Sequence, residues 1–325
     1  MSITALLLSS LLMLPVSAAQ LDELKKLSSS EPDKALQLYS QMLEQANTST
    51  NKQAIIDLHY TGLLAALNSA QWATFERIVK RLYDAELSSY LEPMKFTLLT
   101  RIGVAYRYNN QLEQARMHYT CALAQSASDI EHSLLKVNLA IVYKLSDQPA
   151  MAFQLINSID EKQLSMKVKA GYLVVRGNIL TSLGKFEDAL SSFEQAREQY
   201  GLLDDQLSKV GVTFNILGAA LAYKSLDKFA DYRTGIEVLL KEHDSQYLYW
   251  LDVIAQSIKT QVVTAVHEKW LIEHINPLLE RGYGTAMKAH LEIIDMIQLY
   301  PKQKPKRRGD KSLAEFLGAP WCPKF

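Results

Sequence analysis

A repeated pattern of small and large apolar residues constrains the fold of this chain more than any other feature. It is clearest over residues 177–197, Gly-Asn-Ile-Leu-Thr-Ser-Leu-Gly-Lys-Phe-Glu-Asp-Ala-Leu-Ser-Ser-Phe-Glu-Gln-Ala-Arg. Apolar residues at helical spacing predict one helix that ends near Leu183 and a second that begins at Phe186. Gly184 lies between them, and glycine readily adopts the positive φ that ends a helix. The pattern therefore predicts a helical hairpin.

Small residues in this hairpin let two helix backbones approach closely, and large residues fill the space between them. The small ones are Gly177, Ala189 and Ala196, and the large ones are Leu173, Leu180, Phe186 and Phe193. One hairpin cannot bury its apolar face alone. It must stack on similar units, and such stacks form solenoids with a long concave surface.

This alternation resembles the tetratricopeptide repeat (TPR), whose period is about 34 residues; Leu173 stands where the TPR pattern has a leading Trp. Related segments cover residues 21–47, 56–89, 96–129, 133–166, 170–203 and 213–246. The resemblance implies an all-α, TPR-like α-solenoid of helical hairpins, wound as a right-handed superhelix. A non-repetitive α-helical bundle is the alternative.

Residues 247–300 continue as predicted helices, but the repeat fades there. Ala286–Leu299 reads as a last amphipathic helix before Pro301. Because the end of a solenoid has one face in water, its terminal units diverge from the consensus. We therefore expect residues 247–300 to form divergent capping helices.

The N-terminus reads as a signal peptide over residues 1–19. Ile3–Val16 is apolar and shorter than the roughly 20 residues that span a bilayer. Small residues follow it, so cleavage is expected before Ala19 or Gln20. No Lys or Arg precedes the apolar run, so an N-terminal helix that is kept is the alternative. The expected location is outside the cytoplasm, most naturally the periplasm.

The C-terminal tail, residues 301–325, differs in composition from the rest of a chain whose formal net charge is zero. It holds seven Lys or Arg and two acidic residues, and a short helix is expected over 313–317. Its aromatic residues Phe316, Trp321 and Phe325 either dock on a surface or belong to a disordered tail. The charges offer a peripheral contact with an anionic membrane.

No sequence motif of an active site is present. Phosphate-binding glycine loops, nucleophile elbows and zinc-type cysteine clusters are missing. His267 and His274 are seven residues apart, whereas the metalloprotease motif places two His four apart. We expect no catalytic residue, no metal and no cofactor. Cys121 and Cys322, the two cysteines of the chain, could form a disulfide in an exported protein; Cys121 could equally be a buried apolar residue.

In TPR-like stacks the first helix of each hairpin lines the concave groove. The resemblance therefore implies these groove residues: Arg101, Val104, Arg107, Tyr108, Asn138, Ile141, Lys144, Asn178, Leu221 and Lys224. Arg107, Lys144 and Lys224 would form an interrupted basic line above an apolar floor. The alternative is that the Lys side chains are solvated and the apolar ones pack between helices.

A groove of this kind suits a protein or peptide partner. The resemblance implies a non-enzymatic, exported interaction scaffold that modulates an envelope signalling system. An accessory protein of envelope assembly, or of polysaccharide or protein export, is the alternative function. Nucleic acid is not expected as a partner, because an exported protein rarely meets it.

Overall fold

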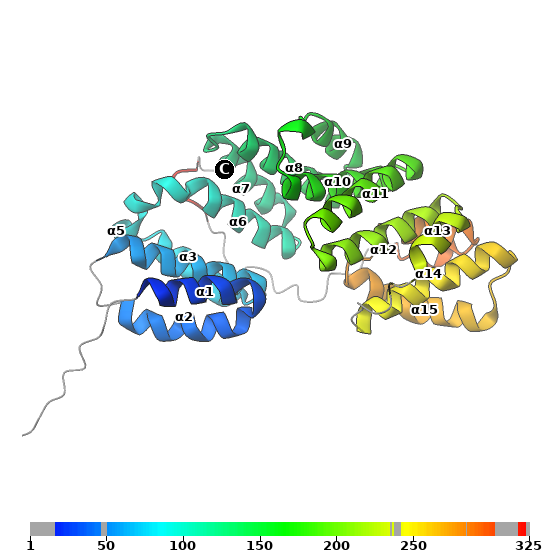
Figure 1. The fold of residues 1–325 in the computed structure, drawn as a ribbon, viewed down its shortest axis with the longest axis horizontal. Helices are drawn as coiled ribbons and strands as arrows, with labels where there is room; N and C mark the ends of the chain where they lie inside the picture. The colour runs from blue at the N-terminus through cyan, green and yellow to red at the C-terminus, as the bar shows by residue number, and fades with distance from the viewer. Residues whose placement is uncertain are drawn as a thin grey trace, which may run out of the picture. The chain divides into compact units, whose positions relative to one another are not determined.

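The computed structural model describes residues 17–46, 51–234, 236, 242–283, 285–302 and 318–322. Throughout these ranges every regular element is helical and no strand occurs, which confirms the all-α prediction. Within each part of the chain, most helices pack against the next helix as hairpins, in a solenoid-like order (Figure 1). Most of the signal segment, the predicted helix at 313–317, Phe316 and Phe325 lie outside the described residues.

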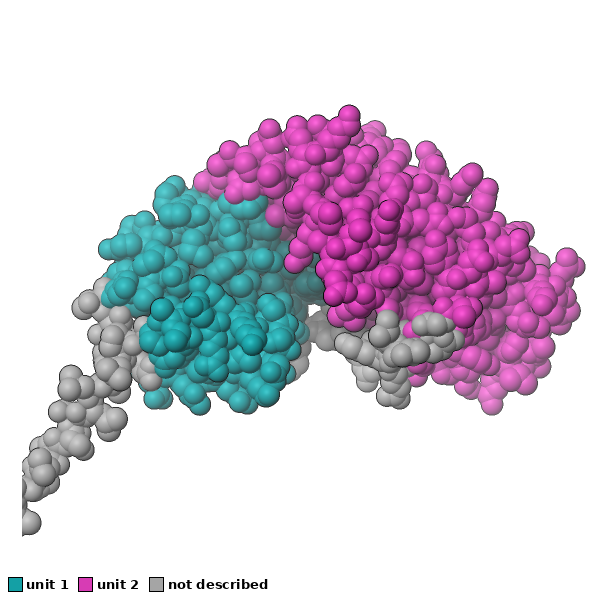
Figure 2. Space-filling view, viewed as in Figure 1, with its two compact units in different colours: residues 1–109, 311–325 teal, residues 110–310 magenta. Residues whose placement is uncertain are grey.

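The chain divides into two compact units, coloured separately in Figure 2. Unit 1 comprises residues 1–109 and 311–325, and unit 2 comprises residues 110–310. The boundary falls in the turn between α6 and α7. It therefore lies inside the range 96–129, which the sequence groups as one repeat.

Unit 1 begins with two hairpins that pack on each other through α1, α2 and α3. Its described helices are α1 (Ala18–Ser30), α2 (Pro32–Ala46), α3 (Lys52–Asn68), α4 (Trp72–Leu82), α5 (Ala85–Ser88), η1 (Ser89–Met94) and α6 (Lys95–Tyr108). Gly62 allows a close approach between α2 and α3. A Cβ there would lie 2.5 Å from the ring of Tyr39.

Unit 2 is a longer series of stacked helices with one continuous apolar core. Its described helices are α7 (Leu112–Ala124), α8 (Asp129–Leu145), α9 (Pro149–Asn157), η2 (Glu161–Gln163), α10 (Met166–Ser182), α11 (Phe186–Leu202), α12 (Gln206–Ala222), α13 (Leu226–Arg233), α14 (Glu242–Thr260), α15 (Ala265–Glu280), α16 (Met287–Ile293) and η4 (Ile297–Leu299). The first helices α8, α10 and α12 contact one another in sequence.

The predicted packing of small against large residues occurs between α10 and α11. A Cβ on Gly177 would lie 2.4 Å from the ring of Phe193, a distance that real Cβ atoms do not show. Gly177, Ala189 and Phe193 are all buried. The glycine therefore lets α11 approach α10 closely enough for the ring to fill the interface.

The turns inside the hairpins share one backbone geometry. Each has a residue with φ between 55° and 72°, two positions before the second helix: Ala70, Asn110, Asp147, Gly184 and Lys224. In four of these turns the next residue donates its backbone N–H to a carbonyl five residues earlier, at 2.8–2.9 Å. This is the Schellman ending of a helix. The sequence indicates it only at Gly184, because the other four residues are not glycine.

The prediction of one continuous last helix over Ala286–Leu299 is wrong. It is divided into α16 and η4 by a turn in which Asp295 has φ 56°. The amide of Met296 donates to the carbonyl of Leu291 at 2.8 Å, so this break is again a Schellman ending. Apolar periodicity alone does not reveal such a turn, because the spacing continues through it.

Candidate binding pocket on unit 2

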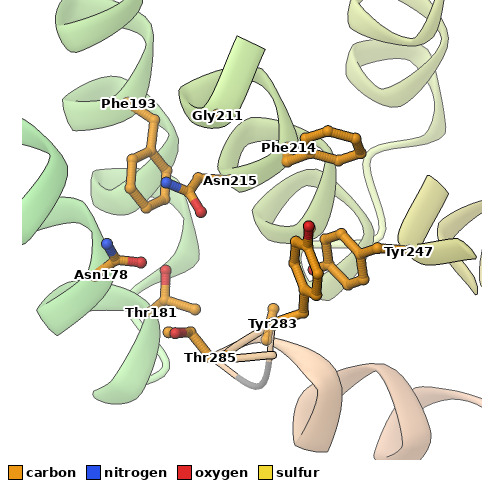
Figure 3. Close-up of a pocket in the computed structure, with 12 residues that line it drawn as sticks. Asn178, Thr181, Phe193, Gly211, Phe214, Asn215, Tyr247, Tyr283 and Thr285 are labelled. Atoms are coloured by element: carbon orange, nitrogen blue, oxygen red, sulfur yellow. The ribbon is translucent and has the colours of Figure 1, made fainter. Parts of the chain in front are cut away.

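A pocket of about 190 Å³ lies where α10, α11, α12 and α14 meet the loop between α15 and α16. Its walls are formed by Asn178, Thr181, Phe193, Gly211, Phe214, Asn215, Gly218, Tyr247, Gly282, Tyr283, Thr285 and Ala286. Among the described residues, no charged side chain belongs to this lining. In Figure 3 the polar residues lie on one side of it, with Phe193, and face three aromatic residues on the other side: Phe214, Tyr247 and Tyr283.

The polar wall carries two carboxamides that are not used inside the protein. Within the described part of the chain, the side chains of Asn178 and Asn215 have no hydrogen-bond partner, and both are half-buried. Thr181 differs, because its hydroxyl donates to the carbonyl of Gly177 at 2.9 Å. Asn178 and Asn215 therefore keep both donors and acceptors for a ligand.

The aromatic wall consists of Tyr247, Tyr283 and Phe214. The two tyrosine rings are stacked, with centroids 4.4 Å apart and planes inclined by 18°. Phe214 lies 5.7 Å from Tyr247 and 6.5 Å from Tyr283 between centroids. Burial raises the pKa of Tyr247, so its phenol stays neutral. This wall suits apolar or planar groups.

Lys144 on α8 reaches the edge of this site. Its ammonium donates to the hydroxyl of Thr285, 141 residues later, at 3.0 Å. This bond holds the loop after α15 against the first helices of the preceding hairpins. Lys144 is therefore engaged by the protein itself rather than solvated.

A buried histidine lies behind the pocket. His290 contacts the carbonyl of Gly218 through Nε2 at 2.7 Å and the indole nitrogen of Trp250 through Nδ1 at 3.3 Å. Gly218 has little room for a side chain, because a Cβ there would meet Tyr247, Ala286 and His290 at 3.3–3.7 Å. These contacts fix α12, α14 and α16 relative to one another and so define the pocket.

Two of the predicted groove residues are wrong. Leu221 is fully buried and cannot line a surface groove, because it packs in the apolar core. Lys224 does not lie on the first helix: it follows α12, in the turn, with φ 60°. Arg107 and Lys144 lie three positions before the positive-φ residues of their own turns. In the turn after α12 the positive-φ residue is Lys224 itself, so the equivalent position is Leu221. The repeat position predicted for Lys224 is therefore displaced by three residues.

The remaining predicted groove residues are divided between the units. Arg101, Val104, Arg107 and Tyr108 belong to unit 1, where the guanidinium of Arg107 lies 4.9 Å from the centre of the Tyr108 ring. In unit 2, the amide of Asn138 is bonded to the carbonyl of Leu134 at 3.0 Å, and Ile141 packs on the core. Of the predicted set, Asn178 lines the pocket and Lys144 bonds to its loop.

Sequence reasoning missed Asn215, Tyr247, Tyr283 and Thr285. Asn215 had a local signal, because it is the lone carboxamide in a run of apolar and small residues from Phe214 to Ala222. The other three come from segments more than 60 residues beyond Asn178. Only the folding back of the chain brings them to the pocket.

The structure also bears on the cysteines, on metal binding, on His274 and on membrane-spanning helices. Neither described cysteine, Cys121 or Cys322, is a free thiol; their pairing with each other stays a prediction. The described residues contain no group of three or more His, Cys, Asp or Glu placed to hold a metal. The Nδ1 of His274 bonds to the carbonyl of Trp270 at 2.9 Å. None of the described helices is both long and apolar enough to cross a bilayer.

Comparisons with known proteins give no family. No model of a protein family matches the chain, and no curated protein matches it. A solved structure to which it is similar is that of a Rap protein complexed with the competence and sporulation factor. The similarity has 15% sequence identity and a TM-score of 0.37, and it covers 86% of this chain and 97% of that one.

Proposed function

We propose that unit 2 is a non-enzymatic binding module that holds an extended segment of another protein at the pocket between α10, α12 and α14. The observation that carries this proposal is the pair of unengaged carboxamides, Asn178 and Asn215, in a neutral pocket. Each peptide bond offers one N–H and one C=O, and a carboxamide complements both. Tyr247 and Tyr283 would then contact an apolar side chain of that segment.

The absence of charged side chains from the described part of the lining supports a peptide backbone rather than a strongly ionic group at this point. A carboxylate or phosphate buried in a neutral pocket would lose hydration without gaining an ion pair. The ammonium of Lys144 is bonded to Thr285 in the pocket lining, and it would contact the segment where that segment leaves the pocket.

Photocrosslinking in cells that naturally make the protein tests this proposal. A benzophenone amino acid at position 215 is expected to capture one defined protein, identified by mass spectrometry. The matched control is position 157, since Asn157 is exposed at the end of a second helix, α9. Equal capture at 215 and 157, or none at 215, would contradict the proposal.

The captured segment, made as a labelled peptide, gives the quantitative test. Replacing Asn178 or Asn215 with Ala is expected to weaken binding by about 0.5–1.5 kcal/mol each, the usual net value of a hydrogen bond. That corresponds to about 2- to 12-fold in Kd. Asn157→Ala should leave Kd unchanged.

We also propose that the protein is exported and acts on an envelope signalling system, as the segment at residues 1–19 suggests. Ser17 is the N-cap of α1 and forms a capping box with Gln20. Cleavage before Ala19 or Gln20 would remove this cap, whose loss costs about 1 kcal/mol of helix stability. N-terminal sequencing of the protein from fractionated cells decides the matter: Ala19 or Gln20 as first residue supports export, and Met1 contradicts it.

A further inference from the structure

The described C-terminal residues pack on unit 1, at the junction between the end of α4 and the start of α6. The ring of Trp321 meets that of Tyr83 edge to face, with centroids 5.4 Å apart and planes at 85°. The ammonium of Lys95 lies 5.5 Å from the centre of the Trp321 ring. The described C-terminal residues, 318–322, are red in Figure 1 and lie beside α6.

A tight turn presents the tryptophan to this surface. The amide of Cys322 donates to the carbonyl of Ala319 at 3.1 Å, which places Pro320 and Trp321 at the centre of the turn. Proline favours such a position because its φ is fixed. Ala319 is buried, although its sequence neighbours Gly318 and Pro320 are exposed. Residues 319–322 therefore form one docked element.

The contact combines two attractions with two buried polar groups that lack hydrogen bonds within the described residues. An edge-to-face aromatic pair and a cation beside a ring are each weak attractions. Lys95 also pairs with the carboxylate of Glu92, so its charge is shared. Within the described residues, the buried Nε1 of Trp321 and the buried hydroxyl of Tyr83 have no hydrogen-bond partner. Each such group costs stability, so these opposing contributions are of similar size.

We infer that Tyr83 and Lys95 form a docking site for the chain's own turn, residues 319–322, and that this turn leaves and returns while unit 1 stays folded once a thiol reductant has cleaved the disulfide of Cys322. The contacts of one short turn are weak by themselves. Attachment to the same chain raises the local concentration of the turn and keeps the site occupied. The same surface would accept an Ala-Pro-Trp turn supplied from another molecule.

The test uses the full chain, kept reduced with dithiothreitol so that Cys322 does not hold the turn covalently, with a synthetic peptide of residues 311–325 that carries a fluorophore and Cys322→Ser. The Trp321→Ala protein should bind this peptide, because its own turn no longer fills the site. The wild-type protein should bind it at least about tenfold more weakly, because its site is occupied. A peptide with Trp321→Ala is the matched control and should bind neither protein.

Chemical modification of Tyr83 gives an independent readout that does not need peptide binding. Its buried hydroxyl should resist nitration in the wild-type protein and react in Trp321→Ala, while Tyr39, buried elsewhere in unit 1, should change in neither. Thermal unfolding by circular dichroism checks that the variant stays folded. Equal peptide binding by both proteins would overturn the inference, as would unchanged nitration of Tyr83 in a folded variant. Neither result bears on the pocket of unit 2.

Discussion

Trp250 on α14 donates its indole N–H to Nδ1 of His290 on α16, with 3.3 Å between the nitrogens. A ring nitrogen that accepts carries no proton, so Nε2 carries it and donates to the carbonyl of Gly218 on α12 at 2.7 Å. The neutral imidazole is fully buried and joins three helices. Protonation of Nδ1 would remove the acceptor for Trp250 and bury a charge.

The first prediction is a loss of stability in acid. Burial lowers the pKa of His290 from its ordinary 6.5 to about 4, against the opposing effect of the Gly218 carbonyl. Between these values the unfolded chain binds a proton that the folded chain does not, so stability falls as pH decreases from about 6.5 to about 4. The contribution of His290 is of the order of 3 kcal/mol at pH 4.

Urea denaturation at a series of pH values measures this effect. His290→Gln keeps one donor and one acceptor but does not titrate, so its free energy of unfolding should change less over the same range. His59 is a second source of acid sensitivity, in unit 1, since burial lowers its pKa to about 4 as well. If the free energy of unfolding depends on pH equally in the wild-type protein and in His290→Gln, the prediction for His290 is wrong.

The second prediction concerns two glycines of α10. Gly177→Ala should destabilise unit 2 by about 1–3 kcal/mol, because the new methyl group overlaps the ring of Phe193. Gly171→Ala, in the same helix, should instead stabilise by about 0.5–1 kcal/mol, since its Cβ meets nothing within 4 Å. Thermal and urea unfolding of both variants checks the opposite signs.

The third prediction concerns the turns with positive φ. Gly184→Ala should cost about 1–2 kcal/mol, although nothing lies within 4 Å of the new Cβ, because the left-handed backbone is strained for alanine. Lys224→Gly should stabilise unit 2 by up to about 1 kcal/mol for the converse reason. Comparing the denaturation midpoints of the two variants tests both effects, and a gain in stability for Gly184→Ala would refute this account.

The fourth prediction concerns the ion pair between α13 and α14. Arg233 donates from Nε and Nη2 to the two carboxylate oxygens of Asp252, at 2.7 and 2.8 Å. Arg233→Lys keeps the charge but cannot form both bonds, so it should lose about 1 kcal/mol. Arg116→Lys, in an exposed pair with Glu113 on one helix, is the control and should change stability by less than about 0.5 kcal/mol.

The sequence by itself determined the helical hairpins and the residues that pack them. Helical periodicity and the placement of Gly177, Ala189 and Phe193 are local features, because the close contact between α10 and α11 is formed by residues of one hairpin. The Schellman turns are also local features. They are hard to predict at Ala70, Asp147 and Lys224, because glycine is the residue that clearly indicates positive φ.

Only the tertiary structure decided which of the predicted groove residues line the pocket. Leu221 was predicted on the groove and is in the core, while Asn215, Tyr247, Tyr283 and Thr285 join Asn178 from distant segments. A helix pattern separates apolar from polar faces, but it does not say what later folds over a face. The loop after α15 and the turn at Trp321 each cover a surface far away in sequence, and such contacts form only when the whole chain has packed.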